Sequence, residues 1–177
     1  MKNEKQILKK LDDIISLIKK DKNIRLREYI KRPLELEEEN FKINSDGWHK
    51  ITIDSEEYLE NPEKDVWELL SEECRGEQLF TYDAAMRETE KAGKLIPSDE
   101  QLSELLKAAE DLKNVKLPGY RGTNGAFYFL GSYLYLWSST ESSSTTAWRR
   151  YIFSSYSTVA PSAVSKGYGF SVRCLKN

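Results

Sequence analysis

The last quarter of the chain, residues 131–177, reads GSYLYLWSSTESSSTTAWRRYIFSSYSTVAPSAVSKGYGFSVRCLKN. It holds twelve of the eighteen serines but only six of the charged side chains, although the whole chain has 27 basic and 29 acidic residues. Segments typical of strands alternate here with runs rich in Ser, Thr and Tyr. Two ordinary explanations are a disordered Ser-rich tail and a plain sheet with polar turns, and the motifs described below favour neither.

Composition limits the function classes. With 177 residues, 39% of them hydrophobic, the chain is long enough for one domain with a core plus an appendage. A net charge of −2 provides no electrostatic basis for binding nucleic acid. We expect no membrane insertion and no export by a standard signal peptide, because no apolar segment of the required length occurs. Localisation therefore stays open between the cytoplasm and attachment to a particle or surface by another route.

The residues that bind metals or catalyse reactions are scarce. Cys74 and Cys174 could form one disulfide, but reduced thiols are expected without an export signal. His49 is the only histidine and lies on the polar register of a strand, so we expect a surface residue and no metal site. Glu141 fits a framework carboxylate better than an acid or base. We therefore expect no metal and no cofactor.

The first segment, residues 3–20, predicts an amphipathic helix. Its apolar positions follow the 4-3-4 spacing of a coiled coil, at Ile7, Leu11, Ile14 and Ile18. The helix could pack on its own domain or associate with copies of itself to form a homo-oligomer, and both interpretations stay open. The charged segment that follows predicts a linker. The expected organisation is a helix over residues 1–22, a linker over 23–40 and a ligand-binding domain over 41–177.

The middle of the chain predicts a hairpin and three helices. Residues 41–43 and 48–53 alternate apolar and polar side chains around a turn at 44–47, which predicts a β-hairpin. Residues 55–75 are acidic and predict a helix around 66–70.

Two further helices have specific start signals. Thr81 fits the N-cap of a helix that ends near Gly93. Ser98 and Gln101 have the spacing of a capping box, which predicts the start of another helix at Asp99. The apolar residues of this helix that we expect to face the core are Leu102, Leu105, Leu106 and Ala109.

Several motifs follow one another in a fixed order between Phe80 and Cys174. They are L-x-P-S-x-x-Q/E-x-x-x-L, G-Y-R-x-x-x-G-x-F-Y, G-S-Y-x-Y-x-W-S-S-T-E, A-W and Y-G-F-S-V-R-C. This order resembles C-type-lectin-fold domains of the formylglycine-generating-enzyme type, in particular the Fibrobacter succinogenes paralogous-domain group. The variable proteins of diversity-generating retroelements share that broad fold. The resemblance implies an α+β, C-type-lectin-like fold with small antiparallel sheets and two helices, to which the N-terminal helix is added.

The resemblance to variable proteins also implies a diversified surface. In those proteins, mutated template adenines convert Asn codons into a restricted residue set that includes Ser, Thr, Tyr, Ala and Arg but excludes Trp, Met, Glu, Gln and Lys. Residues outside that set, such as Trp137, Glu141 and Trp148, coincide with framework motifs. The expected variable, ligand-binding positions are Leu136, Ser142, Ser143, Ser144, Thr146, Arg149, Tyr151, Phe153, Ser155, Tyr156, Ser157, Ala160, Ser162, Ala163, Val164 and Ser165.

Strand geometry divides residues 147–153 between two faces. One face holds Trp148, Arg150 and Ile152, and the other, which we call the Arg149 face, holds Arg149, Tyr151 and Phe153. If the first face points inward, the Arg149 face is an outward stripe of the residue types that dominate antibody-like binding surfaces. The alternative is that these aromatic residues belong to the core, and the same question applies to Leu136.

An enzyme is the weaker prediction. No nucleophile and base can be paired from one His and two distant Cys. Enzymes that generate formylglycine use a cysteine pair, as the resemblance implies, and Cys74 lies before the matched motifs. We therefore predict non-covalent binding of an unknown protein or surface ligand. The alternatives are a fixed binding module of the same fold and, in another class, an enzyme of the formylglycine-generating type.

Overall fold

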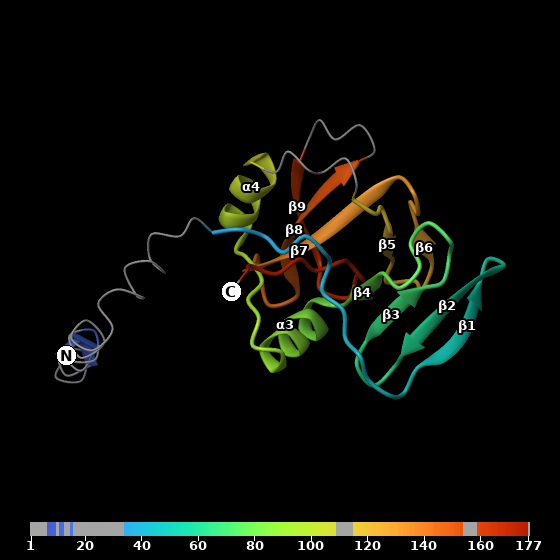
Figure 1. Ribbon diagram of the computed structural model, residues 1–177, viewed down its shortest axis with the longest axis horizontal. Coiled ribbons are helices and arrows are strands. Elements are labelled where there is room, and N and C mark those ends of the chain that lie inside the picture. Colours follow the sequence, from blue (N-terminus) through green and yellow to red (C-terminus); the bar gives the residue numbers. More distant parts are fainter. Residues whose placement is uncertain are drawn as a thin grey trace. The chain divides into compact units, whose positions relative to one another are not determined.

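The chain divides into two units, Met1–Leu34 and Glu35–Asn177. The computed structural model describes residues 7–9, 11, 12, 15, 34–108, 115–153 and 159–176 (Figure 1). In the first unit the described residues before Leu34 are helical, and they expose the apolar side chains of Ile7, Leu8, Leu11 and Ile15. The rest of the expected helix, including Ile14 and Ile18, lies outside the described residues, so self-association stays a prediction.

The second unit is a mixed α+β structure with small antiparallel sheets, as expected (Figure 1). One sheet has the order β1-β2-β3-β4, formed by His49–Ile53, Glu56–Asn61, Val66–Leu69 and Gln78–Phe80. A two-stranded sheet pairs β5 (Tyr120–Arg121) with β6 (Phe127–Tyr128). The third sheet has the order β7-β8-β9, formed by Tyr133–Glu141, Thr146–Phe153 and Val159–Ser165. Helices α3 (Tyr82–Lys91) and α4 (Asp99–Ala108) come between the first two sheets in sequence order.

The two helices with start signals are confirmed. The hydroxyl of Thr81 accepts a hydrogen bond from the amide of Ala84 at the start of α3. The capping box at the start of α4 is complete, because Ser98 N donates to Gln101 Oε1 at 3.0 Å and Gln101 N donates to Ser98 Oγ at 3.2 Å. On α4 the side chains of Leu102 and Leu106 are buried and that of Leu105 is half-buried, while Ala109 lies outside the described residues.

The expected hairpin is wrong, because residues 48–53 do not pair with residues 41–43. Strand β1 pairs with β2, across a turn in which Asp54 and Ser55 both have positive φ, 49° and 68°. Residues 41–43 form no strand. Instead the side-chain amide of Gln78 binds both backbone groups of Ile43, accepting from its N–H at 2.7 Å and donating to its carbonyl at 3.0 Å. A side chain thus replaces the expected strand as the partner of this segment.

The helix expected around residues 66–70 is also wrong, because Val66–Leu69 form strand β3. Val66, Trp67 and Leu69 are all buried, so both faces of the strand are covered. A strand buried on both faces is a continuous apolar run, and periodicity alone does not distinguish it from a short buried helix.

The linker expected over residues 23–40 includes residues that belong to the compact unit. The compact unit begins at Glu35, and backbone hydrogen bonds pair this segment with the C-terminal residues. Glu37 N donates to the Cys174 carbonyl, and Phe41 N donates to the Val172 carbonyl. The charge of this segment indicates a solvated connector, but backbone pairing does not depend on charge and is not visible in composition.

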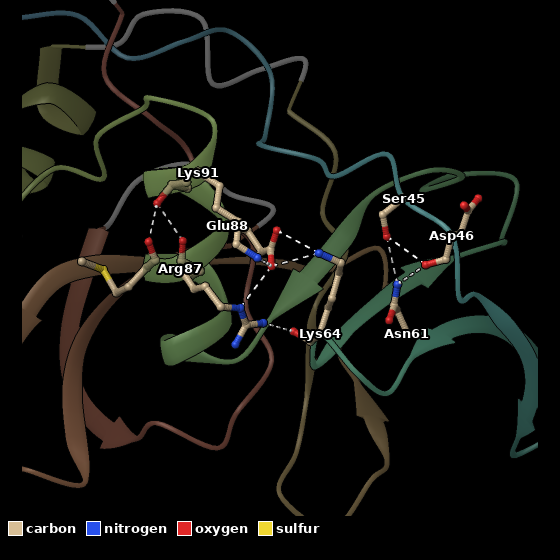
Figure 2. A network of polar contacts seen from close by, with 10 residues as sticks. Ser45, Asp46, Asn61, Lys64, Arg87, Glu88 and Lys91 are labelled. Atoms are coloured by element: carbon tan, nitrogen blue, oxygen red, sulfur yellow. Dashed lines mark hydrogen bonds and ion pairs between the residues drawn. The ribbon is translucent and has the colours of Figure 1, made fainter.

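Helix α3 is held against the loop before β3 by a cluster of ion pairs around Glu88 (Figure 2). The Glu88 side chain is only 6% exposed and binds Lys64 at 3.3 Å, Arg87 at 3.1 Å and Lys91 at 3.4 Å. Burial alone would raise the pKa of Glu88, but hydrogen bonds from these three cations lower it below its ordinary value. In the same view Asn61 donates to Ser45 Oγ and to the carbonyl of Asp46, which ties the 44–47 turn to β2.

Candidate functional site

One face of the β7-β8 pair is covered by α4. Leu134 pairs with Ile152, and Leu136 pairs with Arg150. The apolar members of this face pack in one buried cluster with residues of α4, and the cluster comprises Leu102, Leu106, Leu117, Leu134, Leu136 and Ile152. The expected ligand-binding role of Leu136 is therefore wrong: its side chain is 1% exposed and lies in the core.

A salt bridge accommodates Arg150 on this helix-covered face. Its guanidinium binds both carboxylate oxygens of Asp99, with Nε at 2.8 Å from Oδ1 and Nη2 at 2.9 Å from Oδ2. Asp99 is the first residue of α4, where a negative charge is favourable. The bidentate pair explains how a cation occupies a strand position that faces a helix.

The Arg149 face lies on the opposite side of β8. Directly across on β7, Tyr135 pairs with Tyr151 and Tyr133 pairs with Phe153. The ring centroids are 5.5 Å apart in the first pair and 5.9 Å in the second. Tyr151 and Phe153 are half-buried, so they belong neither fully to the core nor fully to the surface. The interpretation of these residues as an outward stripe and their interpretation as core residues are thus each partly right.

Aromatic residues from other parts of the chain extend this face. Tyr120 from β5 lies with its ring centroid 5.0 Å from that of Tyr135 and 5.7 Å from that of Tyr168. Phe170 stacks on Tyr135 with a centroid distance of 5.5 Å. Sequence reasoning missed these contributions. The alternation of Tyr and Leu at the start of β7 could have placed Tyr133 and Tyr135 on the face, but only the tertiary structure brings Tyr120 and Tyr168 there.

The guanidinium of Arg149 lies among these rings. Its Cζ is 4.8 Å from the ring centroids of both Tyr135 and Tyr151, at cation–π distance. Its Nε and Nη1 atoms are buried and have no hydrogen-bond partner among the described residues. Burial lowers the pKa of Arg149, and the neighbouring tyrosines raise it in part. Burial also raises the pKa of Tyr135 to about 12, which the Arg149 charge opposes, so this tyrosine stays protonated at neutral pH.

The other expected binding positions fall into separate groups. On β9, Ser162 pairs with Arg149, Ala160 pairs with Tyr151 and Val164 pairs with Ala147, so these register positions belong to the Arg149 face. Thr146, Ala163 and Ser165 belong to the opposite register. Ser142, Ser143 and Ser144 are exposed in the turn between β7 and β8. Ser155, Tyr156 and Ser157 lie outside the described residues.

The expected framework residues hold the sheet together. Trp137 is fully buried and its Nε1 donates to the Phe80 carbonyl at 2.8 Å. Trp148 is half-buried, and its carbonyl accepts from Ser138 Oγ at 2.8 Å. Glu141 is exposed and binds Lys166 Nζ at 2.9 Å. Since Lys166 directly follows β9 and also donates to the Ser144 carbonyl, it ties the end of β9 to the β7-β8 turn.

Groups suited to catalysis or metal binding are not gathered in the part of the chain that the structure describes. No cluster of three or more His, Cys, Asp or Glu side chains occurs among those residues. His49 is exposed on β1, which confirms its surface position. Cys74 and Cys174 are buried and free, and burial raises their pKa values to about 11 and about 12. Within the described residues, no helix is long and apolar enough to span a membrane.

Comparison with known proteins identifies the family. Residues 56–176 match the family model described as the Fibrobacter succinogenes major domain. Comparisons with curated proteins and with solved structures found no match. The matched segment starts at the first residue of β2, well before the expected start at Phe80. It contains all three strands of the β7-β8-β9 sheet. The chain therefore belongs to the Fibrobacter succinogenes major domain family.

Proposed function

We propose that this chain is a non-catalytic binding protein that recognises a protein or surface ligand through the Arg149 face, on a C-type-lectin-like scaffold. The observation that carries the proposal is the half-buried aromatic face around an arginine without an acidic partner among the described residues. Tyrosine and arginine side chains bury a large area on binding at low entropic cost. Here the paired strands β7 and β8 hold them in place before a ligand arrives, which reduces the cost of ordering.

The described structure offers less to an enzyme of the formylglycine-generating type. Such chemistry starts from an accessible thiolate. Cys174 is fully buried, and its pKa is raised to about 12, so its thiol is protonated at neutral pH. Cys74 is 1% exposed and its pKa is raised to about 11. A fixed binding module of the same fold remains the alternative, and it would use the same face.

We also propose that the binding surface is diversified by a retroelement. The support is the division of residue types between scaffold and surface. Trp137, which mutation of the adenines of an Asn codon cannot produce, lies in the core, and Glu141 and Lys166 bind each other beside the β7-β8 turn. The β8 positions of the Arg149 face and the turn at residues 142–146 carry only residues of the permitted set, whereas Trp137, which pairs with Arg149 from β7, is fully buried.

The genome that encodes this protein tests the diversification proposal. We expect a second copy of the region coding for residues 131–177, with Asn codons at the variable positions, beside a reverse transcriptase gene. The codons for Trp137 and Lys166 should be identical in the two copies. A complete genome without such a copy would leave a fixed binding module as the function.

We propose, in addition, that the N-terminal helix makes the protein a homo-oligomer, because Ile7, Leu8, Leu11 and Ile15 expose apolar side chains on the described part of it. Oligomers would convert weak single contacts into avidity. Light scattering after size exclusion should show an oligomer for the full-length protein and a monomer for a truncated form that begins at Leu34. The truncated form keeps the backbone pairing of Glu35 and Glu37 with the C-terminal segment. Monomers in both samples would contradict self-association.

A further inference from the structure

Arg149 differs from most of the other enclosed cations of the compact unit; Arg121 also makes no ion pair, but it lies over the Trp67 ring with the charges of Glu60 and Asp65 nearby. Arg150 binds Asp99, Lys64 binds Glu88, and Arg173 donates to Asn40, which in turn binds Glu77. Arg149 has no acidic partner among the described residues, although burial lowers its pKa. A cation that is partly removed from water without a counter-charge costs free energy, which a functional site tolerates more readily than a structural one. This cost suggests that the partner of Arg149 is supplied by the ligand.

We infer that Arg149 binds one carboxylate group of an acidic protein ligand, either an Asp or Glu side chain or the terminal carboxylate of a polypeptide. The inference rests on the proposed binding function and names the chemical group that the Arg149 face selects. Nε and Nη1 are enclosed and without a hydrogen-bond partner among the described residues, and Nη2 is not one of the enclosed nitrogens.

Tyrosine rings surround the guanidinium. The Tyr151 ring centroid is 4.8 Å from Arg149 Cζ, and the rings of Tyr120 and Tyr168, 5.7 Å apart, belong to the same aromatic cluster. A tyrosine hydroxyl can donate a hydrogen bond to an anion. A carboxylate accepts several hydrogen bonds at once, and bonds to a charged acceptor are stronger than those between neutral groups. The guanidinium and the hydroxyls together therefore match a carboxylate.

The charge of the site favours a carboxylate over a phosphate. A phosphate monoester carries a charge of about −1.5 to −2 at neutral pH, so it needs more than one cation. Other basic side chains of the compact unit have contacts of their own. Lys166 binds Glu141 and the Ser144 carbonyl, Arg121 lies over the ring of Trp67 at 3.9 Å, and Arg150 is on the opposite face of β8. Arg149 alone supplies one positive charge, which matches a monovalent anion.

The surroundings favour a protein over an acidic sugar. Tyr133, Tyr151 and Phe153 form a half-buried aromatic surface beside the cation, with Phe129 51% exposed at its border. The ring centroids of Phe129 and Tyr133 are 4.9 Å apart. Protein surfaces carry acidic side chains next to apolar ones. The carboxylate of such a patch would contact Arg149, and the apolar side chains beside it would contact the aromatic rings.

The test uses the full-length protein with arginine side chains labelled for NMR, so that the Arg149 Nε–H signal reports on its own site. The main probe is N-acetyl-phenylalanine, which carries a carboxylate beside an aromatic ring, and its neutral amide is the matched probe. We expect the acid to bind about tenfold more tightly than the amide, because one charge-assisted hydrogen bond is gained. Arg149→Met should abolish this difference, and Arg75→Met, at an exposed arginine, should preserve it.

The possible outcomes are distinguishable. Equal binding of acid and amide would overturn the carboxylate site while leaving the aromatic face as a binding surface. Tighter binding of phenyl phosphate would overturn the choice of a carboxylate, and equally tight binding of glucuronate would overturn the choice of a protein ligand. Retention of the preference in Arg149→Met would assign the anion to another residue. If no probe shifts the Arg149 signal, the inference and the Arg149 face as the binding surface are both wrong.

Discussion

Leu136→Ala destabilises the protein by about 2–5 kcal/mol, although the residue type and position fit a variable surface site. The Leu136 side chain is 1% exposed and packs against Leu102, Leu106 and Ile152. Its truncation leaves a cavity between the sheet and α4, and the surrounding residues refill such a cavity only in part. A loss of this size is a large fraction of the stability of a typical domain.

Denaturant unfolding monitored by tryptophan fluorescence and circular dichroism measures this loss. Leu95→Ala is the matched control, because Leu95 is 68% exposed and its truncation should change the free energy of unfolding by less than about 0.5 kcal/mol. Equal effects of the two substitutions would show that Leu136 is not in the core. The comparison thus decides whether position 136 can belong to a variable surface.

Asn40→Ala destabilises the protein by about 3 kcal/mol, because it removes hydrogen bonds from two buried charged groups. Arg173 donates to Asn40 Oδ1 from Nε at 3.2 Å and from Nη2 at 3.1 Å, and Asn40 Nδ2 donates to Glu77 Oε2 at 2.9 Å. Arg173 is 8% exposed and Glu77 is 6% exposed, so water cannot readily replace the lost amide.

The matched control is Asn44→Ala, at an exposed asparagine in the same part of the chain. Thermal unfolding of both variants should show a large decrease in Tm for Asn40→Ala and almost none for Asn44→Ala. If Asn40→Ala unfolds like the wild type, residues 35–40 are a connector as their composition indicates. A protein shortened to Phe41 would lose the same bridge, so truncations for functional work should keep Asn40.

Two adjacent arginines of β8 have different roles because strand residues alternate between faces. Arg150 faces α4 and completes a bidentate salt bridge with Asp99, so its partner is inside the protein. Arg149 faces the aromatic side, where the described residues provide rings but no carboxylate. Sequence alone presents the pair as two equivalent cations, and the register with β7 separates the arginine that binds Asp99 from the arginine for which we propose a ligand.

Local signals predicted the parts of the fold that depend on neighbouring residues. Thr81 and Ser98 cap α3 and α4 through hydrogen bonds to residues three positions away, so the pattern and the structure coincide. Alternation correctly grouped Arg149 with Tyr151 and Phe153. It did not decide how deeply this face is buried, because that depends on Tyr120 and Phe170, which other segments contribute.

Patterns in the chain were enough to predict the capped helices, the alternating faces of β8, the scaffold position of Trp137 and, through the order of its motifs, the family. The folded chain was needed to show that β2 is the partner of β1, that Asn40 bridges two buried charges and that Leu136 lies under α4. It also brought Tyr120 and Tyr168 to Arg149. Helix capping and strand alternation arise from interactions between residues a few positions apart, so a local pattern predicts them. Strand pairing and side-chain burial depend on contacts with segments that are distant in the sequence, so a local pattern does not predict them.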